Sequence, residues 1–264
     1  MILKDFKYKP LNIKFKADGH TYALDGIPLI GVTTVINTKA KDFLKWWTVK
    51  VMYLFLQEKW DILKVYTKAE KEALLLEGKK KHTERTKKGG DSGTLGHDLI
   101  QKSIETGRRD LINTFDGDET LFKEVENIYK SWLEWEKSKK SIVYLATELV
   151  IGSKTMWTGG TLDAVAIVDD KLELLDWKTN NQLSEDVIIQ TAGYKAMLIE
   201  GGVDKKIARR VVRLSKEKVE YQDKAIETNY DTDLNCFKSL VNIYRWDRDI
   251  KKLNPFNKPK YIKK

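Results

Sequence analysis

The clearest pattern of hydrophobic and polar positions lies in the middle of the chain and predicts a β-hairpin. Residues 164–168 form an apolar run rich in β-branched side chains, which is typical of a buried strand. Residues 169–171 are typical of a tight turn, and residues 172–176 begin a second strand. The middle of the chain is therefore expected to contribute two antiparallel strands to a sheet.

This hairpin would bring two acidic side chains together. Asp163 stands at the start of the first strand and Asp176 near the end of the second, so antiparallel pairing puts both at one end of the sheet. Because strand side chains alternate between two faces, Asp176 and Lys178 are expected on one side and Trp177 on the other.

Further short strands are expected on both sides of this hairpin. The N-terminal part predicts an extended segment at 12–16, a hairpin around 20–24 with a turn at Asp25-Gly26, and an extended segment over 28–36. Residues 207–214 and 218–226 predict another strand pair around a polar turn.

Apolar positions at helical spacing predict helices over 42–60, 119–139 and 231–252, with Asn254-Pro255 ending the last one. The first is interpreted as a buried amphipathic helix with core aromatics rather than platforms for base stacking. Thr67 and Glu70 form a capping-box pattern at the start of a helix reaching Leu76. Residues 78–93, polar, basic and glycine-containing, are expected to be a mobile loop, before a helix opened by Ser92 or Gly93 and ending near Gly107.

Together these elements predict one α/β domain, a central mixed sheet flanked by helices with a helical N-terminal elaboration. Residues 1–264 are assigned to this single domain. Residues 1–90 supply N-terminal strands and helices, residues 91–226 the core, and residues 227–264 a C-terminal helix and a basic tail.

Charge favours a polyanionic partner. The 48 lysines and arginines exceed the 39 acids and give a formal charge of +9, which suits phosphate neutralisation and counterion release. A lysine-rich composition also arises in AT-rich genomes, so charge alone does not identify DNA as the partner.

Composition also bears on the compartment. The one cysteine, Cys236, excludes an internal disulfide framework and favours a reducing compartment. The first residues lack the apolar core of a secretory signal, and the most apolar window, 43–56, is too short to cross a bilayer. The expected protein is soluble, intracellular and not membrane-bound.

The acidic pair and the lysine indicate phosphodiester chemistry. Two carboxylates can hold a hard divalent cation beside a phosphate, where the cation polarises the P–O bond and activates a water. A nearby lysine can orient that water and offset developing charge. An Asp-x-Lys triplet by itself is common, however, and a surface hairpin with a salt bridge is its ordinary interpretation.

A larger set of residues resembles a known family. The set consists of His97 in the segment 93–100, Glu148, Asp163, the triplet 176–178 (Asp-Trp-Lys), and the pair Gln190 and Tyr194. In this order it resembles the PD-(D/E)XK nuclease superfamily, with a restriction-endonuclease-like core. The Gln-x-x-x-Tyr pattern resembles its RecB-type exonuclease branch, which includes the RecB and AddB nuclease domains and the mitochondrial genome maintenance exonuclease. The resemblance spans roughly residues 20 to 200.

The resemblance implies a metal centre and a catalytic lysine. His97, Asp163, Asp176 and the backbone carbonyl of Trp177 would ligate Mg²⁺ or Mn²⁺, and Lys178 would position the attacking water. Members of the branch that carry an iron–sulfur cluster hold it with four cysteines, so no such cluster is expected in this chain.

The remaining residues have ordinary interpretations beside the implied ones. Glu148 would be a ligand or a supporting acid, and is otherwise a solvent-facing strand residue. Gln190 and Tyr194, one helical turn apart, would touch the lysine and the DNA backbone, and are otherwise packing positions on a helix. His97 alone is more often a helix cap or an interior residue than a ligand.

The function implied is a metal-dependent DNA exonuclease acting on single strands or duplex ends in replication, recombination or repair, with a possible partner protein. The products would be a 5′-phosphate and a 3′-hydroxyl. Two alternatives remain open: a structure-specific or nicking endonuclease of the same fold, and a nucleic-acid-binding accessory protein with a vestigial site.

The sequence contains no Gly-x-x-x-x-Gly-Lys-Ser/Thr run, so a fused ATPase is not expected. The small, lysine-rich chain is similar to nucleases of bacteriophages or mobile elements, which implies the cytoplasm of a bacterial or phage-infected cell.

Overall fold

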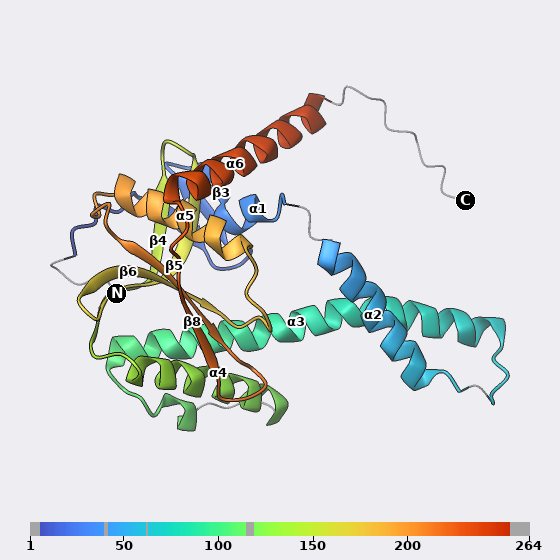
Figure 1. Cartoon of the computed structure of the whole chain (residues 1–264). Helices are drawn as coiled ribbons and strands as arrows, with labels where there is room; N and C mark the ends of the chain where they lie inside the picture. The colour runs from blue at the N-terminus through green and yellow to red at the C-terminus, as the bar shows by residue number, and fades with distance from the viewer. Residues whose placement is uncertain (1–5, 40–41, 62, 115–118, 254–264) are drawn as a thin grey trace.

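A mixed β-sheet forms the central layer of the computed structural model, which describes residues 6–39, 42–61, 63–114 and 119–253 (Figure 1). Its strands are β1 (Ile13–Lys16), β2 (Thr21–Leu24), β3 (Ile27–Gly31), β4 (Ile142–Ser153), β5 (Thr158–Val168), β6 (Lys171–Lys178), β7 (Ala208–Leu214) and β8 (Tyr221–Ala225). The described helices are α1 (Val32–Ile36), α2 (Asp42–Lys59), α3 (Lys68–Thr106), α4 (Glu119–Lys137), α5 (Asp186–Glu200) and α6 (Tyr230–Leu253), with a 3-10 turn at Leu111–Thr114.

Strand β5 organises the sheet. Antiparallel β4 pairs along one of its sides, while the other side is shared between parallel β3 and antiparallel β6. The sheet continues from β6 through parallel β7 to antiparallel β8, and from β3 through β2 to β1. The predicted mixed sheet flanked by helices is confirmed.

Each face of the sheet is covered by its own helices. Side chains of α1, α5 and α6 pack with Leu162, Val165 and Leu174 on one face. Helices α3 and α4 pack with Leu175 and Trp177 on the other face. The alternation of strand side chains is therefore as predicted, and it directs Asp176 away from Trp177.

The turn of the central hairpin is confirmed, but Asp163 lies differently from the prediction. Asp169 and Asp170 adopt φ values of +47° and +66°, the left-handed pair that two-residue hairpin turns require. Strand β5 begins at Thr158, earlier than expected, because residues 158–162 pair with β4 and β3. Asp163 is therefore inside a strand rather than at its start.

The prediction of a loop at 78–93 is wrong, since α3 runs unbroken from the capping box of Thr67 and Glu70 to Gly107. Two features stabilise this polar helix. A Cβ at Gly78 would lie 3.1 Å from Phe55, so α2 packs closely here. Lys81 forms ion pairs with Glu77 and Glu84 at helical spacing. The predicted end at Gly107 is correct, and its φ of +72° is the left-handed cap that glycine favours.

Replacing either of two glycines of α3 with alanine is expected to change the stability of the protein, in opposite directions. At Gly90 an added Cβ meets nothing within 4 Å, so Gly90→Ala is expected to raise stability by about 0.5–1 kcal/mol through helix propensity. At Gly96 the Cβ would lie 2.7 Å from Ile128, so Gly96→Ala is expected to cost about 1–3 kcal/mol. Urea unfolding of both variants measures the difference. A destabilised Gly90→Ala protein would contradict the continuous helix.

Two smaller predictions are also corrected. The extended segment expected over 28–36 ends at Gly31, and Val32, Val35 and Ile36 instead form one buried helical face of α1. On α2, Phe55 is buried as expected, but Trp46 is 77% exposed, so this aromatic is not a core residue. Val51 and Phe55 already occupy the buried face of this helix.

Several predictions are not tested by this structure. The assignment of one domain over 1–264, with its divisions after residues 90 and 226, stays a prediction, although α3 crosses residue 90 without a break. The helix stop at Asn254-Pro255, the basic tail and the side chain of Phe43 lie outside the described residues. Among the described helices, none combines the length and the apolar character needed to cross a bilayer.

Candidate metal centre

Three potential metal ligands converge where α3 meets the β4–β5 hairpin. His97 comes from α3, Glu148 from β4 and Asp163 from β5, and one ligand atom of each lies within 4.8 Å of the other two. His97 Nδ1 lies 3.3 Å from Asp163 Oδ1. All three side chains are partly buried, so they can be reached from solvent without being fully hydrated.

Glycines bring α3 close enough for His97 to join this cluster. A Cβ at Gly96 would clash with Ile128 of α4, and a Cβ at Gly93 would lie 2.7 Å from Thr179 Oγ1, directly after β6. Both glycines therefore allow the helix to approach the sheet and α4 closely. The spacing Gly-x-x-Gly-His is the sequence signal for this contact.

Glu148 is directed by an irregular strand conformation. Its φ of +44° is left-handed, which is rare for a side-chain-bearing residue, and β4 also has a register shift between Tyr144 and Ala146. Thr147 and Leu149 pair with Ala164 and Leu162, so Glu148 stands opposite Asp163. Backbone strain of this kind is concentrated at functional sites.

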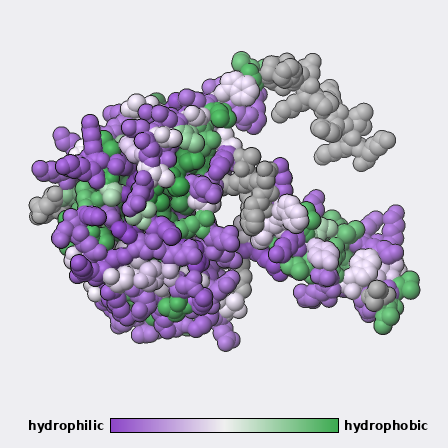
Figure 2. Space-filling view, viewed as in Figure 1, coloured by the Kyte–Doolittle hydropathy of each residue, from purple (hydrophilic) through white to green (hydrophobic). Residues whose placement is uncertain are grey.

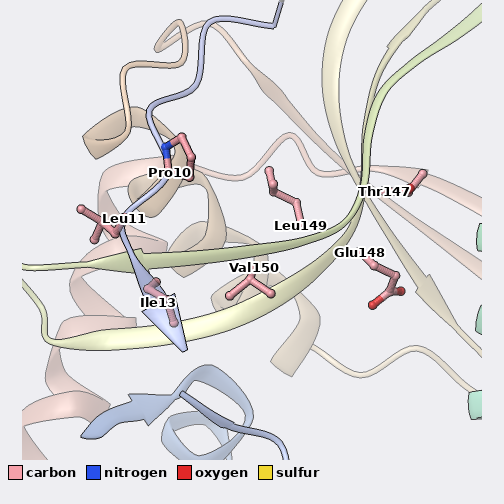
Figure 3. Close-up of a pocket in the computed structure, with 7 residues that line it drawn as sticks. All are labelled: Pro10, Leu11, Ile13, Thr147, Glu148, Leu149 and Val150. Carbon is pink, nitrogen blue, oxygen red and sulfur yellow. The ribbon is translucent and has the colours of Figure 1, made fainter. Parts of the chain in front are cut away.

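A shallow pocket of about 300 Å³ begins at Glu148 and runs toward the N-terminal segment. In Figure 3, Thr147 and Glu148 lie at one end of the lining, and Pro10, Leu11 and Ile13 at the other. Only Glu148 belongs to both this pocket and the three-residue cluster. The pocket therefore lies next to the three-residue cluster and does not contain it.

Asp176 and Lys178 lie beside the cluster on β6. Lys178 Nζ is 2.6 Å from Asp176 Oδ2, and the backbone N–H of Trp177 donates to Asp163 Oδ2 at 2.6 Å. The Trp177 ring lies on the other face of the strand, with its centroid 5.0 Å from that of Trp135. The β6 backbone thus fixes Asp163 while its alternate side chains present the acid and the lysine.

The donor set fits a divalent cation. Asp176 is 2% exposed, and its Oδ2 is paired with the Lys178 ammonium at 2.6 Å. The cluster of His97, Glu148 and Asp163 holds one imidazole and two carboxylates with no ammonium among them. One imidazole nitrogen and several carboxylate oxygens suit Mg²⁺ or Mn²⁺.

Burial and mutual charge perturb the pKa values in the cluster. Burial, with the charge of Asp163, raises the pKa of Glu148 to about 7. Burial opposes charge on Asp163, but His97, Lys178 and the Trp177 N–H together lower its pKa. Burial likewise opposes charge on His97, and the neighbouring Asp163 more than offsets it and raises the pKa. This contrast leaves Asp163 as the ionised carboxylate and Glu148 as a group that titrates near neutrality.

Burial outweighs the attraction of Lys178 and raises the pKa of Asp176. The two strand carboxylates therefore differ, because Asp163 is the better stabilised as an anion. A divalent cation would favour the ionised form of both.

Gln190 and Tyr194 lie on α5, where Gln190 Nε2 donates to the Tyr194 hydroxyl at 3.1 Å. Tyr194 is buried, and a Cβ at Gly160 of β5 would lie 2.8 Å from its ring. Burial, followed by the charge of Asp176, raises the pKa of Tyr194 well above its usual value. Tyr194 therefore stays a neutral hydroxyl close to the acidic residues.

The structure groups His97, Glu148 and Asp163, which is not the same set as the ligands that the resemblance implies. Glu148 lies within the tight group of ligand atoms, whereas Asp176 is outside that group and pairs with Lys178. The assignment of His97, Asp163, Asp176 and the Trp177 carbonyl as the ligands stays a prediction. The packing role of Gly93, Gly96 and Gly160 was not anticipated from the sequence.

The pH dependence of stability tests the state of Glu148. In the metal-free protein its pKa of about 7 exceeds the unfolded value of 4.5, so the folded state holds this proton more tightly. The resulting stabilisation is complete below about pH 4.5 and is lost as pH rises through about 7. Urea midpoints in EDTA are therefore expected to fall over this range, and to fall less in Glu148→Gln. If the urea midpoints of the wild type and of Glu148→Gln fall equally with pH, the pKa of Glu148 is not raised.

The sequence matches no protein-family model and no curated protein. Among solved structures, the chain is similar to a presumed exonuclease from Eubacterium rectale at 12% identity and a TM-score of 0.41, over 61% of this chain and 66% of that one. It is also similar to LHK-Exo in complex with dAMP at 14% identity and a TM-score of 0.36, over 61% and 89%. The chain thus spans just under two thirds of the Eubacterium rectale protein. Similarity at this level carries no argument, so the interpretation of the site rests on its own residues.

Proposed function

We propose that this protein is a metal-dependent nuclease that hydrolyses phosphodiester bonds in DNA. The observation that carries the proposal is the convergence of His97, Glu148 and Asp163 within 4.8 Å, with the Asp176–Lys178 pair beside them. The order and spacing of these residues resemble the RecB-type branch of the PD-(D/E)XK nucleases. The formal charge of +9 suits a polyanionic substrate.

His97, Glu148, Asp163 and Asp176 are the side chains proposed to hold Mg²⁺ or Mn²⁺, with the Trp177 carbonyl as a further ligand. The bound cation would supply Lewis acidity and a water of lowered pKa. The hydrogen bond from the Trp177 N–H keeps Asp163 oriented and ionised, because it satisfies one oxygen and leaves the other toward His97.

Lys178 is proposed to orient the attacking water and to offset the charge that builds on the phosphoryl oxygens. Its ion pair with Asp176 holds the ammonium at the edge of the acidic cluster. The water would attack in line with the leaving oxygen and leave a 5′-phosphate and a 3′-hydroxyl. Gln190, which is partly exposed, is proposed to contact the DNA backbone, and the buried Tyr194 to support it through the hydrogen bond between them.

Exonuclease action on single strands or DNA ends is the proposed form of this activity, in replication, recombination or repair. An endonuclease of the same fold would also cut a closed circular strand, which an exonuclease cannot do. A binding protein with a vestigial site would hydrolyse neither linear nor circular DNA. The coincident presence of Asp163, Asp176 and Lys178 favours an active enzyme, because the fold alone does not require all three.

The test uses end-labelled linear single-stranded DNA beside a closed circular single strand, each with Mg²⁺, Mn²⁺ or EDTA. Stepwise loss of the linear strand alone, stopped by EDTA, is expected, and the label then gives the polarity. Cutting of the circle would instead establish an endonuclease. If neither strand nor duplex ends are cleaved with either metal, the proposed function is wrong.

A further inference from the structure

An arm projects from the sheet-containing body of the molecule. It consists of α2 and the N-terminal part of α3, residues 68–88, and both extend away from the sheet in Figure 1. The two helices pack through one side of α2, where Val51 and Phe55 are buried and Phe55 lies against Gly78. This contact accounts for one apolar face of α2.

A second apolar face of α2 is exposed. Trp46, Val49 and Tyr53 are 77%, 67% and 58% exposed, and Trp60, directly after the helix, is 43% exposed. Trp46, Val49 and Tyr53 are spaced by three and four residues, so they form one row on α2 with the two aromatic rings about 10 Å apart along the helix. Trp60 continues the row past the helix end, with one face of its ring near Tyr66, 5.0 Å between centroids. Large apolar side chains exposed in such a row mark an interaction surface rather than scattered surface residues.

The charges around this row are mostly positive. Residues 45–60 contain three lysines and one acid, Glu58, and residues 79–88 of the adjoining helix contain six lysines and arginines against one acid, Glu84. In Figure 2 the arm carries green and pale side chains bordered by purple ones. Lys59 pairs with Glu58, but the exposed Lys50 lies within the row and would repel its counterpart if two copies met through it. A negatively charged partner with flat apolar groups matches it better.

The basic segment also leads to the candidate active site. Helix α3 runs without a break from Lys79 to His97, a distance of ~27 Å at 1.5 Å per residue. A chain bound along the arm can therefore follow one rigid element into the metal centre.

From these observations we propose that the arm is a binding surface for single-stranded DNA. The bases stack on Trp46, Tyr53 and Trp60, and the phosphates lie along the lysines and arginines of α2 and α3. Exposed rings with flanking basic groups bind unpaired bases without sequence preference, whereas the bases of a duplex are already stacked. The inference rests on the proposed function for the identity of its ligand, and it adds a binding surface separate from the metal centre.

The test measures binding and cleavage separately. Binding of a fluorescein-labelled 20-nucleotide single strand is followed by anisotropy in EDTA. The arm variant is Trp46→Ala/Tyr53→Ala. Its control is Ile243→Ala/Trp246→Ala, which removes two residues of α6 that are 52% and 65% exposed. Stacking predicts roughly tenfold or greater loss of affinity in the arm variant and none in the control. For Lys79→Ala/Lys80→Ala, the slope of the logarithm of the binding constant against the logarithm of the salt concentration is expected to become shallower. The expected change is about 0.7 per lost phosphate contact.

Cleavage of the p-nitrophenyl ester of thymidine 5′-monophosphate, too small to reach the arm, is expected to be the same in all of these proteins. Wild-type affinity in Trp46→Ala/Tyr53→Ala would overturn the proposal, whatever the cleavage result. A lower sedimenting mass for that variant, with unchanged DNA affinity, would make the row a contact between two copies and also overturn it. If the wild type cleaves neither the single strand nor the p-nitrophenyl ester, but binds the single strand through the arm, the proposed function is wrong and the arm proposal stands.

Discussion

Asp163→Asn is expected to abolish metal-dependent cleavage, with a loss on the order of a thousandfold or more. Asp163 contacts His97 through one oxygen and the Trp177 N–H through the other, and its low pKa keeps it ionised. Asparagine keeps the size but removes the negative charge that a divalent cation requires. Titration calorimetry with Mn²⁺ is expected to show weakened binding in the same variant.

The matched control is Asp170→Asn, at the opposite end of the same hairpin. Asp170 is exposed and has a φ of +66°, a conformation that asparagine tolerates, so activity and metal binding are expected to stay at wild-type levels. Equal losses in the two variants would indicate a general effect of charge. Full activity in Asp163→Asn would remove Asp163 from the catalytic site.

Lys178→Met is expected to lower kcat by about 10²–10³-fold while Mn²⁺ binding changes far less than in Asp163→Asn. The ammonium group lies 2.6 Å from Asp176 and is the cation positioned to orient water and offset phosphoryl charge. Methionine keeps most of the apolar stem, so packing is largely retained. Single-turnover cleavage at saturating metal concentration isolates this effect from metal binding.

Lys171→Met makes the same chemical change at the exposed start of the same strand, and wild-type activity is expected. If Lys178→Met instead loses Mn²⁺ binding to the same degree as Asp163→Asn, the lysine acts by organising the ligands. A variant with undiminished kcat would exclude Lys178 from the chemistry.

Local sequence patterns predicted the central hairpin because strand alternation and turn chemistry act over a few residues. The turn at Asp169-Asp170 and the separation of Asp176 from Trp177 follow directly from such rules. The capping box at Thr67 is of the same kind. The juxtaposition of His97 with Asp163 came instead from the resemblance, since they belong to separate elements.

The errors arise where tertiary packing decides. Residues 78–93 have the composition of a loop, but ion pairs of Lys81 and the contact of Gly78 with Phe55 favour a helix. The left-handed conformation of Glu148 has no local signal, because it depends on pairing between β4 and β5. The exposure of Trp46 likewise depends on which face of α2 meets α3.

The most direct test of the metal centre is single-turnover cleavage of an end-labelled single strand across a range of Mn²⁺ concentrations. Wild type, Asp163→Asn and Asp170→Asn are compared under identical conditions. The metal-centre account predicts cleavage that saturates with Mn²⁺ in wild type and Asp170→Asn and is absent in Asp163→Asn. Cleavage that persists in EDTA, or that is equal in wild type and Asp163→Asn, would contradict it.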